Sequence, residues 1–145
     1  MKAMLPCLGL AGLLLAASTG ALAADVPRTP APEGAKVYFI EPHDGATVGK
    51  TFTVKFGLKG MGVAPAGVDF PATGHHHLLI DVKEQPALDA PLPMTDSIRH
   101  FGKGQTETEL TLTPGKHTLQ LLLGDKNHVP FDPAIESQKI TVTVK

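Results

Sequence analysis

The chain is poor in aromatic residues and in cysteine. Of its 145 residues none is tryptophan, one is tyrosine and one is cysteine, Cys7, and aromatic residues make up 5%. So few aromatic rings argue against a flat sugar-stacking face, and a single cysteine excludes an internal disulfide. The 13 basic and 14 acidic residues leave a formal net charge of −1 without any Lys/Arg run. We therefore expect neither nucleic acid nor an anionic membrane surface as a partner.

Familiar catalytic motifs are also absent. The sequence contains no G-x-S-x-G, H-E-x-x-H or P-loop pattern. Ser97 and Ser137 have no neighbouring base, and the carboxylates are scattered without a readable acid/base pair. We therefore predict that the protein is not an enzyme. A dismutase or a small hydrolase is the catalytic alternative, and it would require turnover by a bound ion.

The N-terminus has the pattern of a secretory signal peptide. Lys2 is the only charge before Asp25, residues 8–17 form an apolar run, and residues 21–23 read Ala-Leu-Ala. The apolar run is short for a membrane span, so an uncleaved anchor helix is the less favoured alternative. We predict a signal peptide over residues 1–23, and a mature chain that is periplasmic or secreted, free of cysteine and not inserted in a membrane.

The mature chain begins with a proline-rich segment and continues with alternating apolar and polar residues. Residues 24–35 hold three prolines and are interpreted as an extended linker. Residues 36–145 then form a single domain, large enough to bury its own core. Apolar residues recur with period two in six segments, and a doubtful edge strand lies near residues 97–101. The predicted strands are 36–41, 51–58, 75–82, 97–101, 106–113, 117–123 and 137–144.

Short strands separated by turns predict an all-β fold, an immunoglobulin-like antiparallel β-sandwich of about seven strands. A small closed barrel is the alternative. Successive strands of the sandwich run antiparallel. Three connections therefore lie at the same end of the sandwich: the one before the third predicted strand, the one before the fifth and the one after the sixth.

Seven histidines are the unusual feature of the composition, and three of them are consecutive at residues 75–77. Alternation along a strand places His75 and His77 on the face of Asp81, which we expect to point to water. His76 then faces the core. Two histidines two residues apart on a strand can converge on one metal ion.

The expected topology brings further ligands to the same rim of the sandwich. His128 follows the sixth predicted strand, His100 precedes the fifth, and Met61 lies in the glycine- and proline-rich connection before the third. The predicted metal ligands are His75, His77, His128 and His100, with Met61 as a possible additional ligand. Imidazole suits copper, zinc and nickel, and a thioether favours Cu(I). In an oxidising compartment copper is the favoured ion and zinc the second choice.

Two functional hypotheses follow. The first is a periplasmic binding protein that holds copper or zinc at this histidine cluster, with pH dependence near the ordinary histidine pKa of about 6.5. The alternative is a non-catalytic structural or interaction module of the cell envelope, whose histidines tie loops together and whose partner is another envelope protein. A calcium loop at Asp125, Asn127 and Asp132 is disfavoured, because it lacks the glycine and the bidentate glutamate of such loops.

Three long strings carry a family resemblance. GHHHLLID at residues 74–81, HFGKGQTE at 100–107 and LTPGKHTLQLLLGDKNHVPFDP at 112–133 resemble a family of small exported bacterial proteins carried as a domain of unknown function. The resemblance covers about residues 37–144 and implies an exported β domain, without a function or a site. It also leads us to expect a second histidine where Phe131 stands, which would leave this chain one ligand fewer in that loop.

Overall fold

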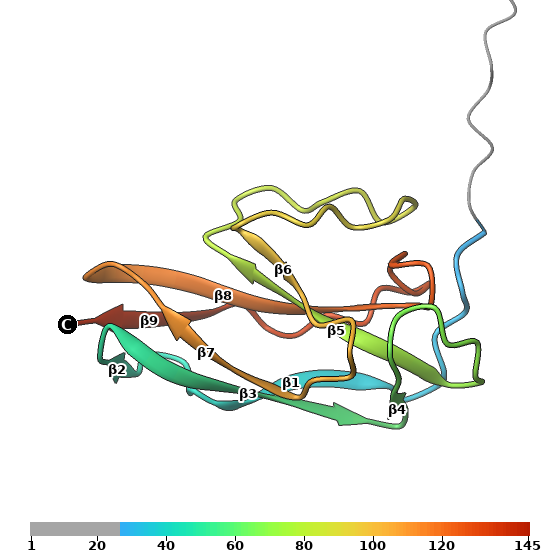
Figure 1. Cartoon of the computed structure of the whole chain (residues 1–145), viewed down its shortest axis with the longest axis horizontal. Coiled ribbons are helices and arrows are strands. Elements are labelled where there is room, and N and C mark those ends of the chain that lie inside the picture. Colours follow the sequence, from blue (N-terminus) through green and yellow to red (C-terminus); the bar gives the residue numbers. More distant parts are fainter. Residues whose placement is uncertain (1–26) are drawn as a thin grey trace, which may run out of the picture.

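The computed structural model describes residues 27–145, which form two β-sheets packed face to face and no helix (Figure 1). The predicted all-β fold is confirmed. The predicted signal peptide, residues 1–23, and its Cys7 lie outside the described residues. Within the described part, no helix is long and apolar enough to cross a membrane. The strands are β1 (Lys36–Glu41), β2 (Thr47–Val48), β3 (Thr51–Lys59), β4 (Gly62–Val63), β5 (Thr73–Ile80), β6 (Ile98–His100), β7 (Glu107–Thr111), β8 (Gly115–Gly124) and β9 (Ile140–Val144).

The strands divide into a three-stranded and a six-stranded sheet. The first has the order β1-β3-β7 and is antiparallel throughout. The second has the order β2-β9-β8-β5-β4, and β6 also pairs with β5. The sandwich and the doubtful edge strand β6 are confirmed, and two short strands in parallel pairing, β2 and β4, are added. The immunoglobulin-like classification stays a prediction.

Several predicted strand boundaries were wrong by one to three residues, and those of β5 and β9 have clear physical reasons. β5 begins at Thr73 and ends at Ile80, because Asp81 has a φ of 55°, which is outside the extended region. β9 begins at Ile140 rather than at residue 137. Residues 135–137 already pair with β8 through an isolated bridge between Leu122 and Glu136. At Ser137 the side-chain hydroxyl, in place of a backbone carbonyl, accepts the amide of Leu121 at 2.9 Å, which interrupts the regular ladder before β9.

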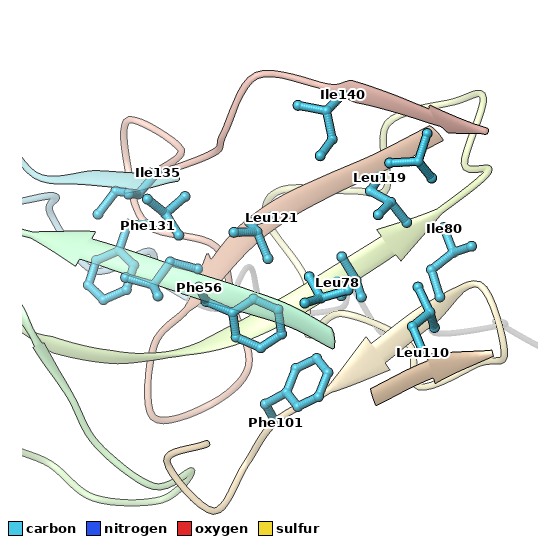
Figure 2. Close-up of a cluster of buried hydrophobic side chains, with 14 residues drawn as sticks. Phe56, Leu78, Ile80, Phe101, Leu110, Leu119, Leu121, Phe131, Ile135 and Ile140 are labelled. Carbon is cyan, nitrogen blue, oxygen red and sulfur yellow. The ribbon is translucent and has the colours of Figure 1, made fainter. Parts of the chain in front are cut away.

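The main core lies between the two sheets and follows from the period-two pattern. In β3, Val54 and Phe56 are 0% and 3% exposed, and they face the leucines of β8. Figure 2 shows Phe56 of β3 together with Leu78 and Leu121 of the six-stranded sheet. The ring centroids of Phe56 and Phe101 are 4.8 Å apart. Each fully buried side chain of this kind contributes about 1.5–3 kcal/mol. Such a core is the stabilisation that a β domain without disulfides requires.

A second apolar layer covers the opposite face of the six-stranded sheet. Leu79 of β5 and Leu122 of β8 are almost fully buried, and they pack with Leu92 of the segment that joins β5 to β6 and with Ile98 of β6. Figure 1 shows this segment, drawn in yellow-green, on the side of the sheet away from β1 and β3. The prediction that the side of β5 carrying His75, His77 and Leu79 faces water was therefore wrong. Only Asp81, just beyond the strand, is exposed as expected.

Candidate metal site

Four histidines from three elements meet at one end of the six-stranded sheet. His75 and His77 come from β5, and His77 is paired with His100 of β6. His75 is paired with Gly124, the last residue of β8, and the loop that follows returns with His128. One ring nitrogen of each histidine lies within 4.8 Å of those of the other three. The predicted gathering of these four residues is confirmed. They lie on the covered outer face of the sheet at the predicted end of the sandwich.

The spacing of the nitrogens is close to that of a four-coordinate metal site. Metal–nitrogen bonds of about 2.0 Å in a tetrahedron place neighbouring nitrogens about 3.3 Å apart. His75 Nε2 and His128 Nδ1 are 3.2 Å apart and share one hydrogen bond. The widest separation, 4.8 Å, would have to shorten by about 1.5 Å on binding. His100 and His128 are partly exposed, so they are the two members of the set with the most room to move.

The buried nitrogens of the cluster have few hydrogen-bond partners. His75 and His77 are 1% and 0% exposed, yet Nδ1 of His75 and both nitrogens of His77 are unpaired within the described residues, as is Nε2 of His100. Burying a polar group without a partner costs about 1–3 kcal/mol, and native proteins rarely tolerate it. A neutral imidazole has one nitrogen with a lone pair, and a bound cation would take one such lone pair from each ring. The convergence of four rings, with several buried nitrogens left without partners, is the observation that points to a ligand.

Burial keeps the imidazoles neutral. Desolvation chiefly, and then repulsion from neighbouring imidazoles, lowers the pKa of His75 to about 4 and that of His77 to about 3. The pKa of His100 is lowered for the same two reasons. Neutral imidazole is the form that binds metals. The predicted pH dependence near 6.5 does not hold for His75 and His77, because protons compete for these nitrogens only in more acidic solution.

Two glycines make room for the rings. A Cβ atom on Gly124 would lie 2.7 Å from Cε1 of His77, and one on Gly102 would lie 2.1 Å from Cε1 of His100. Both distances are below any normal contact, so each imidazole occupies space that a side chain would fill. Sequence reasoning missed both glycines. Gly124 directly follows the apolar residues of β8, and Gly102 lies two residues after His100. These positions are the only local signals that they belong to the site.

Asp125 shapes the loop that carries His128. Its carboxylate is buried, and Oδ1 accepts hydrogen bonds from the amides of Asn127 at 2.8 Å and Val129 at 3.0 Å. Its carbonyl oxygen accepts the amide of His128 at 2.9 Å, and His128 has a φ of 65°. The carboxylate is therefore used within the protein, which removes support from the calcium alternative. Sequence reasoning did not identify this role of Asp125.

The other candidates lie outside the cluster. Met61 packs partly buried against the main core, so its role as an additional ligand stays a prediction that its packing does not support. Phe131 is 1% exposed in the same core, and a histidine at that position would face the interior of the sandwich instead of the four ligands. The expected loss of one ligand at Phe131 is therefore wrong. His76 also faces the main core as predicted, with its ring centroid 5.1 Å from that of Phe56.

His117 lies away from the cluster, at the start of β8. Its Nδ1 is 2.7 Å from Oδ2 of Asp81, and its Nε2 is 2.8 Å from the carbonyl oxygen of Thr113. The Asp81 hydrogen bond is the main reason that the pKa of His117 is raised. This pair ties the end of β5 to β8 and is structural.

Comparison with known proteins supplies a family and no activity. The family model described as "Domain of unknown function (DUF4399)" matches residues 54–145. This range contains β5 to β9 and all four clustered histidines. No curated protein matches the chain. No solved structure matches it either.

Proposed function

This chain belongs to the family described as Domain of unknown function (DUF4399), and from its histidine cluster we propose that it binds a transition metal in the periplasm or outside the cell. Copper is the favoured ion and zinc the second. The convergence of four imidazoles, with buried nitrogens left unpaired, carries the proposal. The proposed location rests on the signal-peptide pattern at residues 1–23.

The ligand set favours holding an ion over catalysis. Catalytic zinc sites characteristically use three protein ligands and keep a fourth position open for water or substrate, whereas closed sites use four. Here four imidazoles are available, and two of them are almost fully buried. All-imidazole sites suit copper and zinc, and an oxidising compartment without thiol competitors favours copper. We therefore propose a carrier or buffer for the ion and not an enzyme.

One observation favours the second candidate function, a structural or interaction module of the cell envelope. The hydrogen bond between His75 and His128 already joins β5 to the loop after β8 without any metal. In that case the cluster would contribute to stability alone. Replacing the histidines would then lower the free energy of unfolding and would leave metal affinity at the level of ordinary surface histidines.

Calorimetric titration of the metal-free protein with Cu(I), Cu(II) and Zn(II) distinguishes the metal-binding function from the envelope-module function. We expect one-to-one binding with a Kd of about 1 μM or lower, which corresponds to about −8 kcal/mol. A His100→Gln/His128→Gln variant, which changes only the partly exposed ligands and so preserves the fold, should lose this binding. The exposed His43 provides the matched control, since His43→Gln removes a histidine outside the cluster. Equal, weak binding by all three proteins would contradict the metal function and favour the envelope module.

A further inference from the structure

The segment before β1 is hydrogen-bonded to the loop that carries His128. The amide of Asp132 donates to the carbonyl oxygen of Thr29 at 2.9 Å, and the amide of Ala31 donates to the carbonyl oxygen of Asp132 at 2.8 Å. Nε of Arg28 donates to the carbonyl oxygen of Pro130 at 3.2 Å. Residues 28–31, which fall in the segment interpreted as a linker, therefore lie along residues 130–132 in the manner of a short parallel strand pair.

One side-chain contact connects this segment to the metal site. The hydroxyl of Thr29 donates to Oδ2 of Asp125 at 2.6 Å, across 96 positions of sequence. Oδ1 of the same carboxylate holds the amides of Asn127 and Val129, which flank His128. Thr29 thus restrains the carboxylate, and the carboxylate restrains the turn that aims His128 at the cluster.

Asp125 lies directly beside the cluster. It follows Gly124, whose partner in β5 is His75, and its carbonyl oxygen accepts the amide of His128. The residue is 3% exposed. Imidazole ligands bring no negative charge, so a bound ion would keep its full charge inside a largely buried site. A buried charge without a counter-charge is strongly disfavoured. A carboxylate fixed beside the ligands offsets that cost.

We propose that Asp125 is a positioning residue and the counter-charge of the metal site, and that Thr29 of the N-terminal segment holds it in place. This inference rests on the proposed metal function. It makes residues 28–31 part of the binding site instead of a passive connection. Groups that hydrogen-bond behind metal ligands typically change metal affinity by about 10- to 100-fold when they are replaced.

The two roles of Asp125 can be separated by substitution. Asp125→Asn keeps an oxygen that accepts the amides of residues 127 and 129, and it removes the charge. Because Coulomb energy is proportional to the charge of the ion, the logarithm of the affinity loss should be about twice as large for Zn(II) as for Cu(I). We expect a loss of about 10-fold for Cu(I) and about 100-fold for Zn(II). A purely structural role would reduce both affinities equally.

The Thr29 contact is tested with two near-isosteric variants. Thr29→Val removes the hydroxyl and keeps the shape, and Thr29→Ser restores the donor. In the metal-free protein, Thr29→Val should speed amide hydrogen exchange at Asn127 and Val129 about tenfold or more, without affecting β8 and β9, and Thr29→Ser should return it to the original rate. Metal affinity should follow the same order, with rescue by serine.

These measurements separate failure of the inference from failure of the proposed function. If the unaltered protein binds Cu(I) and Zn(II) tightly and neither Asp125→Asn nor Thr29→Val changes affinity, the inference is overturned and the metal function stands. If the unaltered protein binds neither ion, the metal function and the counter-charge both fail. Unchanged amide exchange in Thr29→Val would overturn the positioning role in either case, even if Asp125→Asn does not fold.

Discussion

Replacing Gly124 by alanine is the sharpest test of the site as the structure describes it. The new Cβ would lie 2.7 Å from Cε1 and 3.2 Å from Nδ1 of His77, and 3.4 Å from Cα of His128. His77 is 0% exposed, so its ring has no open space into which it can turn. Relief requires a shift of about 0.7 Å in a close-packed region, and such overpacking costs about 1–3 kcal/mol. Displacing one ligand by that distance should also reduce metal affinity at least about tenfold.

Gly102→Ala provides the informative comparison. Its Cβ would lie even closer to an imidazole, 2.1 Å from Cε1 of His100. His100 is only partly buried, so its ring can turn outward. We expect a stability loss of less than about 1 kcal/mol together with a clear loss of metal affinity. Gly49→Ala is the matched control, since the nearest atom to its Cβ is 3.8 Å away, and it should leave both quantities within about 0.5 kcal/mol.

Denaturant unfolding of the three metal-free variants measures the stability changes, provided that the m-values agree. Calorimetric titration with Cu(I) and Zn(II) measures the affinities. If Gly124→Ala proves as stable as Gly49→Ala and binds the ions equally well, the imidazole of His77 does not occupy the space beside residue 124. The described geometry of the cluster would then be wrong.

Three further predictions concern acid stability, the Asp81 contact and the second layer. In the presence of a chelator, the free energy of unfolding should be highest above a pH of about 6.5 and should fall as the pH is lowered toward 4. The reason is that His75, His76 and His77 take up protons near pH 6.5 in the unfolded chain, whereas burial lowers their folded pKa to about 4, about 4 and about 3. Each histidine contributes up to about 1.4 kcal/mol per pH unit, and a denaturant midpoint that does not change between pH 7 and 5 would contradict this prediction. The pKa of His117 is raised in the folded protein, so its effect on stability has the opposite pH dependence. The stabilisation from its pairing with Asp81 should be complete below pH 6.5 and should be lost as the pH rises through the folded pKa. His117→Gln should therefore cost no more than about 1 kcal/mol at pH 6, and less at pH 8, in paired unfolding curves. Leu122→Ala should destabilise by about 2–5 kcal/mol, and a loss below about 1 kcal/mol in the same assay would mean that no second layer covers this face.

Much of the fold could be predicted because a half-buried strand has a local signature. The bounds of β1, Lys36–Glu41, are those that the alternation predicts, and β3 differs from its predicted end by one residue. The gathering of the four histidines was also predictable, because antiparallel connectivity alone places the start of β5 and the end of β8 together. Leu122 is a local indication of the second layer, because a leucine among the residues of β8 that alternate with the main-core leucines indicates that this face is covered as well.

The remaining features depend on contacts between segments that are far apart in the sequence. The segment between β5 and β6 has no periodic pattern, so its packing over Leu79 and Leu122 could not be predicted. Nor could the burial that lowers the pKa of His75 and His77. Gly124 became a site residue only because the ring of His77 lies against it.

By itself, the sequence determined an all-β domain, the faces that point into its main core, and the end of the sandwich at which its histidines meet. These follow from side-chain alternation and strand direction, which are local properties of the chain. Only the tertiary structure decided that His75 and His77 are buried and neutral with ring nitrogens left unpaired, and that Thr29 and Asp125 hold the neighbouring loop. Burial, proton affinity and hydrogen-bond pairing belong to the packed molecule, because each depends on which distant residues exclude water from the same place.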